Sequence, residues 1–206
     1  MAVLSRQLAV HADTRQRILD TARRLFSDDG YLGVSMNDIA RHLGITKAAL
    51  YHHFKGKAAI YGAVLDDAFS GLRAQVAEAL EQKSAEGRLR RLIGNYIEFG
   101  LREKSLVNIV VTKLPPDEPA IRERVVRFRE ELADQVRPIV EQNLVKGDFA
   151  QAGDARFMTS LLMWMMDGLL MECSLFDRVV DAAKIADHIL AVLRLPCLPL
   201  ADAPAR

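Results

Sequence analysis

The apolar residues of this 206-residue chain repeat almost everywhere with the period of an α-helix. Between residues 13 and 29, for example, apolar side chains recur at 18, 19, 22, 25 and 26, the spacing that lines one face of a helix. No run of alternating apolar residues is bounded by turn signals as a strand would be. The pattern therefore predicts an all-α fold, and a hydrophobic fraction of 50% is enough for a buried core.

Two short helices with a tight connection are predicted at residues 35–54. Ser35 and Asp38 have the spacing of a capping box, Gly44 suits the left-handed conformation that ends a helix, and Thr46 can cap the next helix. A first helix, capped by Asp13, precedes them and can pack across both. Together they predict a three-helix head of the helix-turn-helix type.

Longer helices are expected from residue 57 onward and would form a larger helical bundle body. Gly87, Pro115-Pro116 and residues 147–153 mark the joints, and Pro138 should kink or divide the helix that contains it. The expected helices are 57–82, 86–103, 105–113, 118–146, 154–175 and 178–195, about nine in total with those of the head. The tail from residue 196 is expected to fray.

Charge is distributed unevenly between the head and the body. Residues 1–57 hold nine Lys and Arg against five Asp and Glu, although the whole chain has a net charge of only +1. Four of the five histidines also fall in this basic head. In a helix-turn-helix, the N-terminal residues of the recognition helix face base edges in the major groove of DNA. Double-stranded DNA is therefore the expected partner.

The predicted recognition helix offers side chains for two kinds of DNA contact. Leu50 and Phe54 should face back into the head. The positions toward base edges are Lys47, Ala48, Ala49 and His52, of which Lys47, Ala48 and His52 are the candidate readers. The donors suited to phosphate oxygens are Ser35, Asn37, Thr46, Tyr51, His53, Lys55 and Lys57. A plain α-bundle is the alternative for the head, and a metal site at His52-His53 is disfavoured because adjacent helical positions point roughly 100° apart.

These residues resemble the TetR family of bacterial regulators. The resemblance is carried by Ile39-Ala40, by LGIT at 43–46 and by LYHHFKGK at 50–57. It begins with the helix from Thr14-Arg15 to Phe26 and with Gly30-Tyr31, and it covers about the first 60 residues closely. One departure is Lys47-Ala48-Ala49, where many relatives carry a glycine or a larger polar residue, so operator specificity is expected to lean on His52, Lys47 and DNA shape.

The resemblance implies a homodimeric repressor on a palindromic operator, released by a small-molecule effector bound to the body. It divides the chain into a flexible tail at 1–10, a DNA-binding domain at 11–71, an effector-binding and dimerisation domain at 72–197, and a flexible tail at 198–206. Repression, rather than activation, follows from the resemblance alone. The alternative is a helical small-molecule carrier or enzyme whose head no longer binds DNA.

The last two long helices look buried on more than one face, which favours a four-helix dimer seam over a single-chain core. The predicted seam residues are Leu161, Gly168, Leu169, Ile185, Ile189 and Leu193. An effector pocket should lie among the helices from 57 to 175. The side chains able to line it are Tyr96, Phe99, Phe128, Trp164 and Met165, with Asn95, Glu98 and Glu172 as nearby polar groups.

Other functional classes find little support in the sequence. The N-terminus lacks the apolar run of a secretory signal, and residues 157–171 are too short to span a bilayer and are interrupted by Asp167. Cys173 and Cys197 have no metal-ligand spacing and fit a reducing compartment. No nucleophile elbow or phosphate-binding glycine loop is present. We therefore expect a cytoplasmic protein that is not an enzyme and needs no cofactor or metal.

Overall fold

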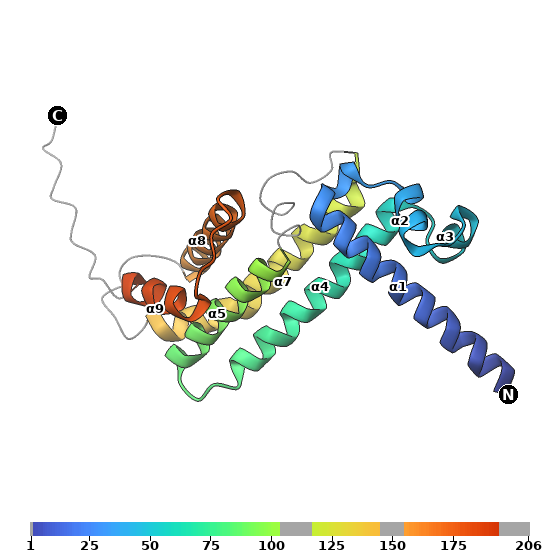
Figure 1. Ribbon diagram of the computed structural model, residues 1–206. Coiled ribbons are helices and arrows are strands. Elements are labelled where there is room, and N and C mark those ends of the chain that lie inside the picture. Colours follow the sequence, from blue (N-terminus) through green and yellow to red (C-terminus); the bar gives the residue numbers. More distant parts are fainter. Residues whose placement is uncertain (1, 104–116, 145–154, 194–206) are drawn as a thin grey trace, which may run out of the picture. The chain divides into compact units, whose positions relative to one another are not determined.

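The computed structural model describes residues 2–103, 117–144 and 155–193, and over these ranges the chain is helical with no strand. The elements keep the labels of Figure 1. They are α1 (Ala2–Gly33), α2 (Met36–Leu43), α3 (Lys47–His53), α4 (Lys57–Leu80), α5 (Ala85–Arg102), α7 (Pro119–Leu144), α8 (Ala155–Leu175) and α9 (Ala182–Leu193). The all-α fold with a helix-turn-helix head and a helical body is confirmed. The predicted helix at 105–113 and the tail at 198–206 lie outside the described residues.

Helix α1 begins earlier than the sequence predicted. It starts at Ala2, so Asp13 lies inside the helix instead of capping it, and residues 2–10 are helical where a tail was expected. The segment before Asp13 contains several good helix formers, and these extend the helix past a local cap signal. Near the other end, Gly30 leaves the helical conformation at φ 69°, ψ 174°, where the predicted apolar stripe stops.

The long helices follow the predicted boundaries with two differences. Helix α7 runs through Pro138, so of the two outcomes expected there, a division of the helix was wrong. Helix α9 begins at Ala182, later than residue 178, because the Asp181 carboxylate caps it: Oδ1 accepts hydrogen bonds from the amides of Ala183 at 3.0 Å and Lys184 at 3.2 Å.

The chain divides into two compact units. The first contains Met1–Gly71 and Arg102–Phe128, and the second contains Leu72–Leu101 and Arg129–Arg206. In the first unit, α1 packs on α2 and α2 packs on α3 (Figure 1). Three rings from α1 and α4 form its aromatic core: Tyr61 lies edge-on to Phe26 and to Tyr31, with 4.9 Å between centroids in both pairs.

In the second unit, α5 and α8 approach each other closely at Gly100. A Cβ atom added there would lie 2.2 Å from Leu170 Cδ1, so only glycine fits this position without a shift. Asn95 is buried and donates to the backbone oxygen of Gln75 at 2.9 Å, which ties α5 to α4. No helix in the described part of the chain is long and apolar enough to cross a membrane.

Candidate DNA-binding interface

Both caps predicted for the helix-turn-helix are present. Ser35 and Asp38 form a capping box at the start of α2: the Asp38 amide donates to Ser35 Oγ at 3.2 Å, and the Ser35 amide donates to Asp38 Oδ2 at 3.0 Å. Gly44 takes the left-handed conformation, with φ 66°, that ends α2. Thr46 Oγ1 accepts from the Ala49 amide at 3.1 Å and begins α3. Local sequence signals therefore fix the turn between α2 and α3.

Helix α3 has one buried face and one exposed face, as predicted. Leu50 is fully buried and Phe54 is 6% exposed, so both side chains pack into the head. Arg15 of α1 lies over the Phe54 ring, with 5.1 Å from its guanidinium carbon to the ring centroid. The end of α3 is therefore anchored to α1, and the opposite face of α3 is left to solvent.

The exposed face holds the side chains predicted to read bases. Lys47, Ala48, Ala49 and His52 are all exposed. The Lys47 ammonium lies 6.0 Å from the centroid of the Tyr51 ring, which is 47% exposed. The rings of His52 and His53 are 5.6 Å apart between centroids and nearly perpendicular. This face therefore presents an ammonium, two methyl groups and two imidazoles within two turns of helix.

The predicted phosphate donors surround this face and differ in solvent exposure and in their hydrogen bonds within the protein. Asn37, Thr46 and Lys55 are exposed, and His53 is half-buried. The Ser35 hydroxyl donates to Asp38 Oδ2 at 2.6 Å, and these hydrogen bonds lower the pKa of Asp38, so a carboxylate stays charged at the start of α2. Ser35 is thus engaged in capping within the protein.

Lys57 has a structural contact that the sequence did not suggest. Its ammonium donates to the backbone oxygen of Tyr31 at 2.8 Å and lies 4.2 Å from the centroid of the Tyr31 ring. Partial burial lowers the pKa of Lys57, and the negative charge of Glu118 offsets part of this lowering. Lys57 thus joins the start of α4 to α1, and two of its three N–H donors are left over.

In the second unit, the structure places only part of the predicted effector pocket in the interior. Phe99 is buried and Met165 is half-buried, whereas Trp164 is 58% exposed and lies edge-on to Phe157 at 6.4 Å. Phe128 belongs to the first unit, where it stacks on Phe69 with 3.8 Å between centroids. Of the predicted lining residues, Trp164 therefore lies at the surface of the described chain.

The interior of the second unit contains a polar cluster that the sequence analysis did not assemble. The Tyr96 hydroxyl donates to Asp167 Oδ1 at 2.5 Å, and an Arg129 guanidinium nitrogen lies 2.7 Å from Asp167 Oδ2. Burial and the neighbouring carboxylate raise the pKa of Tyr96, which keeps the hydroxyl protonated. The signal that could have found the cluster is Asp167 itself, because an acid inside an apolar helix needs a partner.

The residues predicted for the dimer seam differ in how exposed they are on α8 and α9. Gly168 is exposed, Leu161, Leu169, Ile185 and Leu193 are half-buried, and Ile189 is 8% exposed. The most exposed large apolar side chains of α8 were not among the predicted seam residues. They are Phe157 at 54%, Trp164 at 58%, Met171 at 39% and Leu175 at 71% exposure.

A capped turn between two short helices, with one exposed and basic face on the second, defines a helix-turn-helix DNA-binding protein. Comparison with known proteins agrees. A model described as bacterial regulatory proteins, tetR family, matches residues 18–64, and one described as Tetracyclin repressor-like, C-terminal domain, matches residues 82–171. Together they cover more than half of the chain, one in the predicted head and the other in the predicted body.

Individual proteins show the same likeness. The transcriptional regulator AcrR of Shigella flexneri is 24% identical over 205 residues, covering 89% of each chain. The structure of the regulator PfmR from Thermus thermophilus is similar with a TM-score of 0.73 and 23% identity, covering 88% of this chain and 99% of PfmR. That of AibR in complex with isovaleryl coenzyme A and operator DNA has a TM-score of 0.69 and 23% identity, covering 88% and 98%.

The chain belongs to the TetR family of bacterial regulatory proteins. Membership of this family of regulatory proteins confirms the class of function expected from the sequence.

Proposed function

We propose that two copies of the chain place their α3 helices in successive major grooves of a palindromic operator, and that an effector bound in the second unit releases the DNA. The observation that carries this proposal is the two-sided α3. Leu50 and Phe54 hold the helix in the head, and Lys47, Tyr51 and His52 face solvent. An α-helix with one such face fits the width of the major groove.

Three residues of α3 are proposed to read base edges. The Lys47 ammonium suits the acceptor atoms of guanine, the Ala48 methyl group suits the thymine methyl, and the His52 imidazole can donate or accept one turn later. Because Ala48 and Ala49 offer only methyl groups, sequence-dependent DNA shape must supply part of the specificity.

The surrounding donors are proposed to bind phosphate and to fix the register of the head on the duplex. Lys57 can reach a phosphate with the donors not used by Tyr31, and Ser35 acts mainly by capping α2, whose first amides favour an anion. The remaining proposed phosphate contacts are Asn37, Thr46, Tyr51, His53 and Lys55.

The test is a selection of duplexes from a randomised pool, followed by anisotropy titrations of variants on the selected duplex and on a scrambled one. Lys47→Ala and His52→Ala should each cost about 1–3 kcal/mol on the selected duplex and blur its preference over the scrambled one. Lys55→Ala, the matched control, should weaken both duplexes by a similar factor. Equal losses on both duplexes for all three variants would refute base reading by Lys47 and His52.

A dimer seam on α8 is proposed from a regular apolar stripe. Its members recur at intervals of four and three residues, the spacing that faces a partner helix in an α-helical seam. They are Phe157, Leu161, Trp164, Gly168, Met171 and Leu175. Large exposed apolar side chains in such a row mark an interaction surface, and a second copy of α8 is complementary to it.

The effector is proposed to act on the second unit near the cluster of Tyr96, Arg129 and Asp167. These side chains come from α5, α7 and α8, so a ligand that competes for any of them would shift the contacts among three helices. Because AibR is bound to isovaleryl coenzyme A, acyl-coenzyme A thioesters are the first class to titrate. Calorimetry with isovaleryl coenzyme A, against coenzyme A alone, tests this class.

We further propose that the chain acts by binding rather than by catalysis, in the cytoplasm where it meets DNA. A helical carrier that has lost DNA binding is the competing possibility. It is disfavoured by the exposed basic and aromatic side chains of α3, which a carrier does not need.

A further inference from the structure

Helix α1 is held at two points by carboxylates from a distant part of the chain. Glu103, directly after α5, accepts a hydrogen bond from Arg23, and Glu118, directly before α7, accepts one from Tyr31. These pairs are separated by 80 and 87 residues in the sequence. Arg23 lies before the break at Gly30 and Tyr31 lies directly after it, so one contact holds the long part of α1 and the other holds the segment that follows the break.

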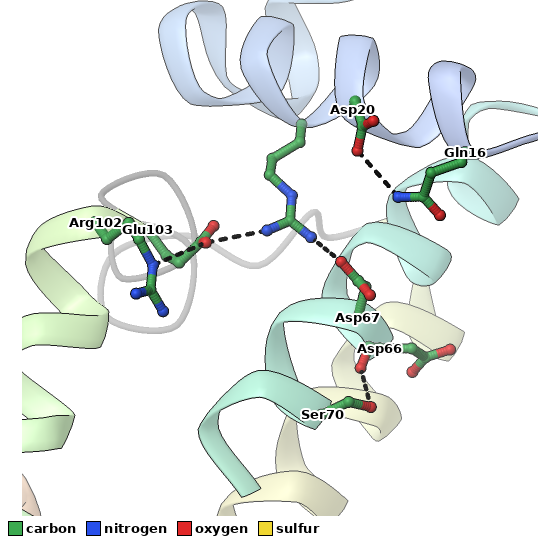
Figure 2. A network of polar contacts seen from close by, with 8 residues as sticks. Gln16, Asp20, Asp66, Asp67, Ser70, Arg102 and Glu103 are labelled. Atoms are coloured by element: carbon green, nitrogen blue, oxygen red, sulfur yellow. Dashed lines mark hydrogen bonds and ion pairs between the residues drawn. The ribbon is translucent and has the colours of Figure 1, made fainter. Parts of the chain in front are cut away.

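Arg23 makes the first contact as a bridge. One guanidinium nitrogen donates to Glu103 Oε1 at 3.0 Å, and the other pairs with Asp67 of α4 (Figure 2). The Glu103 side chain is only 9% exposed, and Arg102 Nε lies 3.7 Å from its Oε1. A buried carboxylate is tolerated only while its cationic partners stay in place, so Glu103 strongly resists separation from Arg23.

Tyr31 makes the second contact. Its hydroxyl donates to Glu118 Oε1 at 2.8 Å, while its backbone oxygen accepts from Lys57 at 2.8 Å. Burial and the Glu118 carboxylate raise the pKa of Tyr31, so the phenol stays protonated and remains a donor. The ring is 7% exposed and packs against Phe26 and Tyr61, which leaves it little freedom to turn away from Glu118.

The orientation of α1 determines that of the recognition helix α3, because the helices of the head pack on one another. Helix α1 packs on α2, α2 packs on α3, and Arg15 of α1 lies over Phe54 at the end of α3. We propose that Glu103 and Glu118 are positioning residues for operator binding, which fix α1 and so present α3 to its half-site at a set angle. The proposal rests on the dimeric operator binding proposed above, and neither carboxylate needs to touch DNA.

Positioning of this kind has a specific consequence for a dimer. Binding of the second head is intramolecular once the first is bound, and its strength depends on how often the second α3 is correctly placed. A loosened α1 lowers that probability, whereas the contacts of a single head with one half-site remain the same. Loss of either carboxylate contact should therefore weaken binding to a palindrome and spare binding to a half-site.

The test measures anisotropy on two duplexes: the palindrome selected by the wild-type protein, and the same duplex with one half-site scrambled. The variants are Glu103→Gln, Glu103→Asp and Tyr31→Phe, the last of which removes only the hydroxyl that binds Glu118. Matched controls are Asp28→Asn on α1 and Glu123→Gln on α7, both exposed carboxylates. Circular dichroism melting confirms that each variant is folded at the assay temperature.

We expect each test variant to lose at least about fivefold in affinity for the palindrome, the lower end of typical coupling between sites. The half-site affinity of the test variants, and both affinities of the controls, should stay within twofold of wild type. Arg23→Gln is measured alone and combined with Glu103→Gln, and the double variant should lose no more than the larger of the two single losses, because the two residues act as a pair.

Two results would overturn the proposal: an unchanged palindrome affinity in Glu103→Gln and Tyr31→Phe, or equal losses on both duplexes, which would mean a general defect of the head. If Glu103→Gln does not fold, Glu103→Asp and Tyr31→Phe decide the question. Failure of the wild-type protein to prefer any duplex would refute the proposed function instead, and would be seen before any variant is made.

Discussion

Tyr96 on α5 donates its hydroxyl hydrogen to Asp167 on α8 across 2.5 Å, and the other oxygen of Asp167 faces Arg129 on α7. One carboxylate thus joins three helices of the second unit. The Asp167 side chain is 13% exposed and that of Arg129 is 27% exposed, so solvent screens this pair little.

Removing the shared carboxylate should therefore destabilise the protein more than removing the hydroxyl. Asp167→Ala leaves Arg129 as a largely buried charge without its partner, which costs about 3–5 kcal/mol. Tyr96→Phe leaves the ion pair intact and should cost about 1–3 kcal/mol. Urea unfolding checks the order, with Glu172→Ala as the control because its ion pair with Arg178 is more than half exposed. Equal costs for the two buried sites would contradict the shared role of Asp167.

Two tyrosines of the first unit should respond differently to the loss of a hydroxyl. The Tyr61 hydroxyl is buried without a hydrogen-bond partner among the described residues, so Tyr61→Phe should leave the free energy of unfolding unchanged or raise it slightly. Tyr31→Phe loses the bond to Glu118 and should cost about 1 kcal/mol. Chemical denaturation of the pair gives the comparison. A clear loss in Tyr61→Phe would show that its hydroxyl has a partner.

The capping box should make α2 sensitive to acid. The pKa of Asp38 in the folded protein is lowered from its usual 3.8 by its hydrogen bonds with Ser35. Its stabilising contribution is therefore complete above that usual value and is lost as the pH falls through the lower folded value. Asp38→Asn should lower the melting temperature at pH 7, with a smaller difference from wild type at pH 3. Asp29→Asn, an exposed control on α1, should show no such difference at either pH.

The proposed seam on α8 predicts how one substitution changes the oligomeric state of the protein. Trp164→Arg places a charge in the middle of the proposed seam and should yield monomers in sedimentation velocity. Val126→Arg introduces the same charge at an exposed apolar position of α7, where exposure is 46%, and should leave the dimer intact. A Trp164→Arg protein that sediments as a dimer would move the interface away from this stripe.

The sequence predicted well what depends on neighbouring residues. Ser35 with Asp38, Gly44 and Thr46 are local signals, and each takes the predicted role in the structure. The buried face of α3 followed in the same way from the spacing of Leu50 and Phe54. By contrast, Asp13 was wrong as a helix start because the residues before it also favour a helix.

Contacts between distant residues could not be predicted in this way. Nothing near Glu103 or Glu118 indicates that their partners are Arg23 and Tyr31, since periodicity gives the face of a helix but not its neighbour. Aromatic residues mislead for the same reason: Trp164 was expected in a pocket and lies on an exposed face. The sequence thus predicted the buried and exposed faces of α3 more securely than the burial of the residues expected in a pocket.

Salt dependence of DNA binding is the most direct test of the claim that α3 and its surrounding donors bind a duplex. For the wild-type protein and the selected duplex, affinity should fall roughly 10³-fold or more between about 50 and about 200 mM salt, because each neutralised phosphate releases counterions. At every salt concentration the selected duplex should bind more tightly than the scrambled one. Binding that is negligible on every duplex, or that does not change with salt, would contradict the account.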